Sequence, residues 1–187
     1  MFLLGIIVLA MIWGWLRGGK LAGLGRQELR CFWLAPLAFL LQWALNRTVA
    51  GGSELTWFWS YSLHLFSYLL MFFFIWVNRS LPGIKLMFLG VFCNFLVIAL
   101  NGGAMPVKPE GLPPSLVQAL ADQSVATHQL WQPGTKLPFL GDIILIPYPS
   151  PRRFSIGDFF MVAGLFIFIT RAMTGTGPGE KGLRQVK

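Results

Sequence analysis

The chain has 187 residues, of which 55% are hydrophobic and 15% aromatic, and its mean hydropathy is +0.64. Soluble domains carry a smaller apolar share, so this composition excludes that class and predicts an integral membrane protein. The net charge of +8 does not indicate nucleic-acid binding, because the basic residues lie at the ends of apolar runs, where they orient helices and meet anionic headgroups.

Five apolar runs predict an all-α bundle of about five transmembrane helices. They cover residues 2–16, 31–45, 57–77, 86–100 and 154–170. No positive residue precedes the first run and Arg17 follows it, which favours an uncleaved helix whose N-terminus lies outside. We therefore expect a single transmembrane domain over residues 1–170 and a basic, Gly-rich tail over 171–187.

The basic residues also predict the orientation. The first and third connections and the tail carry ten Lys and Arg, whereas the second and fourth connections, although longer, carry five. Basic residues prefer the cytoplasmic side. This places the tail in the cytoplasm and the long loop 101–153 outside, in the cytoplasmic (inner) membrane of a bacterium.

The outer loop is expected to be structured, since long irregular loops are uncommon in compact folds. Residues 116–131 have the pattern of a short helix, and residues 143–146 that of an extended segment. Asp142 either caps the turn before Ile143 or pairs with Arg152 or Arg153.

Polar residues at membrane depth are costly and often functional, so those near the outer end form a candidate ligand pocket. His64 lies roughly 10 Å below the outer end of its run, at about 1.5 Å rise per residue. Asn94 and Asn101 are seven residues apart and share a helix face. The candidate pocket residues are His64, Asn94, Asn101, Gly102 and Gly103.

Each candidate also has a structural interpretation. His64 suits a hydrogen bond between helices, because a bis-histidine haem needs a second buried histidine and His128 lies in the loop. Gly102 and Gly103 suit a turn. Cys31 and Cys93 fall inside apolar runs and suit packing, so no disulfide, metal site or cofactor motif is indicated.

Ser155 and Asp158 match the S-x-x-[DE] pattern of a helix capping box. In such a box the acid satisfies the first N–H groups of the helix and complements its dipole. A catalytic or ligand role for Asp158 stays open beside that interpretation.

The segments Asn-Gly-Gly-Ala-Met-Pro-Val (101–107), Leu-Gly-Asp (140–142) and Phe-Ser-Ile-Gly-Asp (154–158) together resemble a bacterial multi-pass membrane family described as a domain of unknown function. The resemblance covers the chain from about its first helix to Thr170. It implies a membrane protein and no particular activity.

A fainter similarity is to the lipoprotein signal peptidases, which place two aspartates at the outer ends of membrane helices. The segment 154–164 looks like the start of their final helix, with Asp158 at a catalytic position. The Asn-x-x-Asp-Arg motif of that family is missing after the preceding helix, so Asp142 would have to supply the second carboxylate. Such a pair must lie close enough to share a proton.

Three functions follow as hypotheses. The absence of a complete catalytic or cofactor motif favours a non-catalytic subunit of a larger membrane complex, with the lipid bilayer and other membrane subunits as partners. The first alternative is an intramembrane hydrolase that uses Asp142 and Asp158. The second is a small transporter or lipid-binding protein that uses the face of His64, Asn94 and Asn101.

Overall fold

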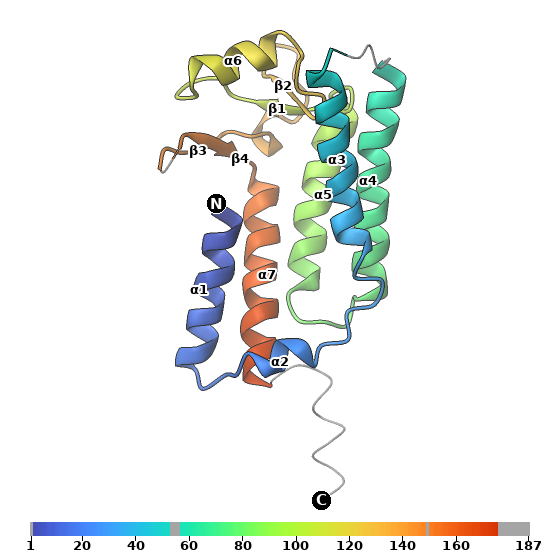
Figure 1. The fold of residues 1–187 in the computed structure, drawn as a ribbon. Coiled ribbons are helices and arrows are strands. Elements are labelled where there is room, and N and C mark those ends of the chain that lie inside the picture. Colours follow the sequence, from blue (N-terminus) through green and yellow to red (C-terminus); the bar gives the residue numbers. More distant parts are fainter. Residues whose placement is uncertain (1, 53–56, 149, 176–187) are drawn as a thin grey trace, which may run out of the picture.

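The computed structural model describes residues 2–52, 57–148 and 150–175, and this part of the chain is mostly helical (Figure 1). The helices are α1 (Phe2–Leu16), α2 (Ala22–Gly25), α3 (Leu34–Ala50), α4 (Trp57–Val77), α5 (Ile84–Leu100), α6 (Pro114–Ala121) and α7 (Ile156–Thr174). The strands are β1 (Met105–Val107), β2 (His128–Leu130), β3 (Ile144–Ile146) and β4 (Arg152–Phe154), and a 3-10 turn, η1, covers Pro138–Leu140.

Two described helices are long and apolar enough to cross a membrane, over Phe58–Val77 in α4 and Ile156–Thr174 in α7. The apolar parts of two others, Leu4–Leu16 and Ile84–Leu100, are shorter. A helix also forms near the predicted run 31–45, but it begins at Leu34, three residues after Cys31, whose φ of 51° is left-handed. The helical class is thus confirmed, with two candidate spans rather than five. The predicted tail lies almost wholly outside the described residues.

The apolar helices form a row in the order α1, α7, α5, α4 and α3, each packed against the next (Figure 1). Buried apolar side chains join neighbours along this row. Ala10 of α1 packs with Phe168 and Ile169 of α7, and Ile75 of α4 packs with Val91 of α5. The row is curved. Helices α5 and α4 form the middle of the curve, and α7 and α3 flank them on the two sides.

Glycine permits the closest contact in this row, between α5 and α7. Gly157 and Gly164 lie seven residues apart in α7 and share a helix face. On the other side of the contact, Gly90 lies within α5 and Gly83 is the N-cap residue of that helix. A Cβ added to Gly90 would lie 2.4 Å from the Gly157 carbonyl oxygen, and one added to Gly164 would lie 2.6 Å from the Gly83 carbonyl oxygen. Two backbones can approach this closely only where side chains are absent.

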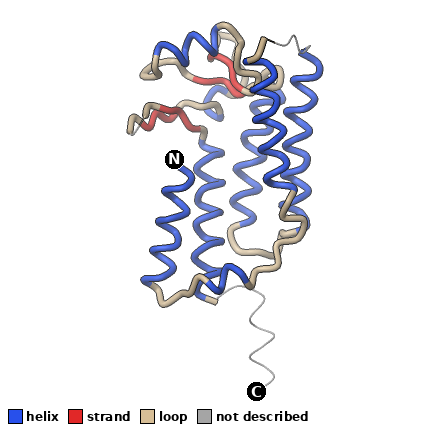
Figure 2. The backbone as a smooth tube through the Cα atoms, in the orientation of Figure 1, coloured by secondary structure: helices blue, strands red, loops and turns tan. Residues whose placement is uncertain are grey.

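The segment between α5 and α7 folds into a cap over one end of the bundle, and the described strands gather there (Figure 2). β1 pairs in parallel with β2, and β3 pairs antiparallel with β4. Within the cap, Val107, Leu112 and Leu120 form an apolar cluster. The prediction of a structured loop is therefore correct.

Two details of the loop prediction change. The helix predicted over residues 116–131 is shorter, because α6 ends at Ala121 and Gln123 takes a left-handed φ of 53°. Residues 128–130 form β2 instead. The extended segment predicted over residues 143–146 corresponds to β3.

Gly164→Ala is expected to destabilise the protein by about 1–3 kcal/mol, because the new methyl group meets the backbone of α5 and cannot be accommodated without a helix shift. The matched control is Gly5→Ala in α1, where an added Cβ meets no atom within 4 Å. That change should be neutral or stabilising by up to about 1 kcal/mol, since alanine favours helix. Thermal unfolding in detergent micelles measures both, and equal behaviour of the two variants would contradict the close contact.

Candidate functional site

A cavity of about 1000 Å³ opens along the curved row of helices, between α3 and α7. Its walls are apolar over most of their length and include Phe39, Met71, Val91, Leu165 and Phe168. Its polar lining consists of residues from the cap and the start of α7, namely His128, Asp142, Tyr148, Ser150, Arg152, Arg153 and Asp158. The cavity is therefore a long apolar groove with one polar end.

A smaller cavity of about 160 Å³ adjoins the polar end. It shares His128, Asp142 and Asp158 with the groove, and its lining also includes His64 and Asn94. Two candidate pocket residues and both candidate aspartates thus face one connected region.

Asp158 forms the predicted capping box. Its Oδ2 accepts from the Ser155 backbone N–H at 2.9 Å, and its own N–H donates to Ser155 Oγ at 3.0 Å. The same carboxylate also reaches α5, because Asn94 Nδ2 donates to Asp158 Oδ1 at 3.0 Å. Ser155 Oγ donates to Asn94 Oδ1 at 2.8 Å. Asp158 is therefore both a helix cap and a link between two helices.

Gly157 allows the Asn94 side chain to approach the first turn of α7 closely. A Cβ at position 157 would lie 2.0 Å from Asn94 Oδ1, so any larger residue would push the amide away. The glycine contact between α5 and α7 consequently sets the geometry around Asp158.

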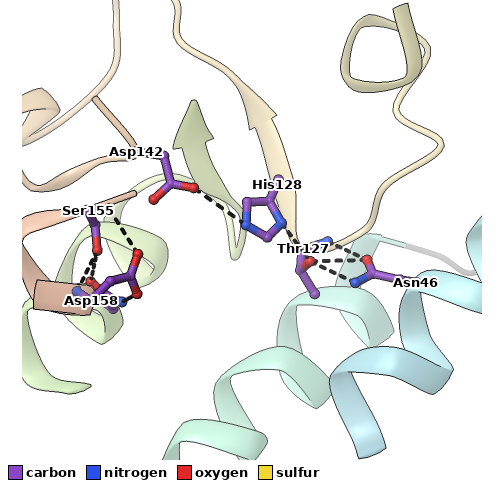
Figure 3. A network of polar contacts seen from close by, with 7 residues as sticks. Asn46, Thr127, His128, Asp142, Ser155 and Asp158 are labelled. Carbon is purple, nitrogen blue, oxygen red and sulfur yellow. Dashed lines mark hydrogen bonds and ion pairs between the residues drawn. The ribbon is translucent and has the colours of Figure 1, made fainter. Parts of the chain in front are cut away.

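The cap fixes Asp142 through its backbone. The Asp142 N–H donates to the Pro106 carbonyl at 2.8 Å, and the Asp142 carbonyl accepts from the Lys108 N–H at 3.1 Å. The residue is only 7% exposed, and its Oδ2 lies 3.7 Å from His128 Nε2 (Figure 3). The titratable side chain recorded in contact with Asp142 is therefore that of His128, and the predicted pairing with Arg152 or Arg153 is not observed.

Burial raises the pKa of the Asp142 carboxyl well above its usual value of 3.8, and the negative charge of Asp158 raises it further. A carboxyl desolvated in this way favours its neutral form, which can donate a hydrogen bond. Acids with raised pKa values in clefts are frequent functional groups.

His128 was assigned to the loop by sequence reasoning and was not a candidate. Its Nδ1 lies 2.8 Å from Thr127 Oγ1, and Asn46 of α3 holds Thr127 by accepting its backbone N–H at 3.0 Å (Figure 3). Burial, and then the nearby His64, lower the pKa of His128 to about 4. The side chain is 42% accessible, yet it lines both cavities, so much of that surface faces the interior. The sequence signal was weak, since His128 is simply one of two histidines.

Both shifts favour the neutral forms, a protonated carboxyl at Asp142 and a neutral imidazole at His128. The carboxyl can donate a proton and the imidazole can accept one, so the pair is suited to general acid and base chemistry. In the same region Asp158 supplies a carboxylate oxygen to the wall of the cavity.

The remaining candidates organise the backbone. His64 is buried, with its Nδ1 2.6 Å from the Gly103 carbonyl oxygen. Asn101 donates to the Val97 and Lys136 carbonyls and accepts from the Lys136 N–H, which anchors the loop to the end of α5. Gly102 and Gly103 have φ values of 74° and 87°, as their proposed turn requires. None of these three loop residues lines the two cavities.

Within the described residues, no three His, Cys, Asp or Glu side chains gather in a way that could hold a metal ion.

Asp142 should remain protonated at pH values above 3.8. The infrared carbonyl band of a protonated carboxyl should therefore persist in the wild type at pH values above 3.8 and be absent from Asp142→Asn. Because the folded pKa is raised, ionisation of the unfolded chain lowers stability as pH rises from 3.8 toward the folded pKa, and the Asn variant should lack this loss. A band that disappears at the usual aspartate pKa would contradict the buried neutral acid.

Residues 26–170 match a Family of unknown function (DUF5317). An uncharacterized protein of Thermotoga maritima is 34% identical over 113 residues, a match that covers 59% of this chain and 64% of the relative. No solved structure matches the chain. These matches confirm the predicted resemblance to an uncharacterised family and add no support for the similarity to lipoprotein signal peptidases. The chain belongs to the DUF5317 family.

Proposed function

We propose that this protein is an integral membrane protein of the bacterial inner membrane that binds a membrane amphiphile. The apolar chains of the ligand occupy the groove between α3 and α7, and its polar group meets Asp142, Asp158 and His128. The observation that carries this proposal is the groove itself, a single cavity with long apolar walls and acid–base groups confined to one end.

The outer surface supports residence in a bilayer. Large apolar side chains stand exposed along the helices, including Trp43 on α3, Trp59 and Phe73 on α4, and Val8 and Trp13 on α1. A soluble monomer rarely exposes so continuous an apolar surface. In the proposal α1, α3 and α5 also span the membrane, with tilt or local thinning making up for their length.

Charge supports one orientation. Basic residues lie at the end of the bundle opposite the cap (Figure 1). They are Arg17 and Lys20 after α1, Arg79 in the turn between α4 and α5, and Lys85 in the first turn of α5. The positive-inside rule then gives a cytoplasmic C-terminus, an N-terminus outside and a cap facing away from the cytoplasm. The polar end of the groove lies at the outer leaflet in this arrangement.

The size and lining of the groove suit a lipid chain. Pockets of a few hundred to about 1000 Å³ accommodate small-molecule ligands, and apolar walls with a few convergent polar groups are typical of such sites. The volume of this groove lies at the upper end of that range, and the carboxyl of Asp142 is buried at its polar end.

Val162→Trp is expected to displace the bound lipid, because Val162 lines the groove and the indole would fill part of it. Native mass spectrometry of the full chain in mild detergent should find a lipid adduct on the wild type and a strongly reduced adduct on the variant. The control is Val8→Trp, on an exposed position of α1 outside the groove. Equal lipid occupancy in both variants would count against the groove as the binding site.

A second candidate function is aspartate-dependent hydrolysis of a lipid-linked substrate. It is favoured by one observation, that Asp142 with its raised pKa shares the cavity with Asp158. Two carboxyls with different proton affinities can divide the work, one donating a proton to the leaving group while the other activates water.

Asp142→Asn and Asp158→Asn should each reduce such turnover by at least about a hundredfold, the usual contribution of a positioned acid or base. Both changes keep the shape of the side chain. Because both oxygens of Asp158 accept hydrogen bonds, a thermal unfolding curve checks that Asp158→Asn is folded before its turnover is compared. Hydrolysis of fluorogenic lipid esters and lipid-linked peptides by the purified chain is the assay. Turnover that survives in either variant removes this candidate.

The accessory-subunit function remains a prediction. Gentle purification of the native protein tests it, because a stoichiometric membrane partner would support it. The groove is compatible with either a free lipid-binding protein or a subunit that presents lipid to its partner.

A further inference from the structure

We propose that the amphiphile carries a phosphate head group, which binds to Arg153 beneath the β3–β4 hairpin. This inference rests on the proposed lipid-binding function and specifies the class of ligand. It follows from a cluster of donor side chains on the wall of the groove that the acid–base site does not use.

Arg153 is a buried cation with incomplete partners. Its side chain is 7% exposed and lines the groove. Its Nη1 donates to the Ile143 carbonyl and its Nη2 to the Glu110 carbonyl. Its Nε is buried and has no hydrogen-bond partner among the described residues. Guanidinium carries five N–H donors, and leaving buried donors without acceptors costs free energy, so an acceptor is expected.

The charge of Arg153 is poorly compensated as well. Its one recorded carboxylate neighbour is Glu110, whose Oε2 lies 3.8 Å away on a side chain that is 65% exposed. Ion pairs with such exposed, solvated partners are weak. A buried charge needs a close counter-charge, and the ion pair recorded for Asp142 is with His128 and not with Arg153. An anion bound in the groove would supply this counter-charge to Arg153.

The same hairpin offers further donors. Tyr148, Ser150 and Arg152 line the groove together with Arg153, and all four side chains can donate hydrogen bonds. Two of the four are arginines, whose planar guanidinium groups can donate two parallel hydrogen bonds to phosphate oxygens. The hairpin wall is therefore cationic, in contrast to the wall formed by His128, Asp142 and Asp158.

The position of the hairpin along the membrane normal also fits a lipid head group. The hairpin directly precedes α7, so it lies where the proposed membrane span begins. Tyr148 is 84% exposed and Leu145 beside it is also exposed, as expected of side chains at a membrane interface. A phosphate at the lipid–water boundary would thus meet Arg153 while its chains extend down the groove.

The test compares two lipids that differ only in the phosphate, phosphatidic acid and diacylglycerol with the same acyl chains. Native mass spectrometry of the full wild-type chain in non-ionic detergent should show phosphatidic acid bound at least about tenfold more tightly, the effect of a hydrogen bond to a charged group. Arg153→Gln should bind both lipids equally. Arg79→Gln, an exposed position at the opposite end of the bundle, should keep the wild-type preference.

The outcomes separate the two proposals. Equal binding of both lipids by the wild type would overturn the phosphate assignment and leave the groove as a lipid site, whereas binding of neither lipid would overturn the groove too. Competition by inorganic phosphate as strong as that by phosphatidic acid would assign the site to a free anion. A folded Arg153→Gln protein with unchanged preference would remove Arg153 as the contact. The wild-type comparison stays decisive if that variant fails to fold.

Discussion

The close backbone contact between α5 and α7 is the constraint on which the rest of the structure depends. Two pairs of glycines, Gly83 with Gly164 and Gly90 with Gly157, let the helices meet without intervening side chains. This proximity lets Asn94 bond both Ser155 and Asp158, which ties the start of α7 to α5. The hairpin that leads into α7 is positioned as a consequence, and the polar end of the groove with it.

Curvature of the helix row then produces the groove. Helices α7, α5, α4 and α3 pack in sequence, and the cap covers one end of the space between the outer two (Figure 1). Polar residues enter only from the cap and the first turn of α7, so the apolar and polar parts of the cavity are separated along its length. Such a division matches an amphiphile better than a uniformly polar solute.

Desolvation governs the chemistry of the polar end. Burial raises the pKa of Asp142 and lowers that of His128, so both shifts favour the neutral forms. A neutral carboxyl and a neutral imidazole are less costly to bury than an ion pair. Arg153 cannot become neutral in this way, which explains why it is the group that most needs an anionic partner.

The sequence by itself determined the helical class, the positions of the apolar helices within a few residues, and the capping box of Ser155 and Asp158. These depend on periodicity, hydropathy and contacts three residues apart, which a linear pattern records. It placed Asn101 in a pocket where the structure uses it to anchor a loop, and it passed over His128. Only the tertiary structure decided which polar residues meet, because positions 94, 128, 142 and 158 are brought together by β pairing and by the glycine contact of two helices. Neither of these long-range contacts leaves a pattern that can be read from neighbouring residues.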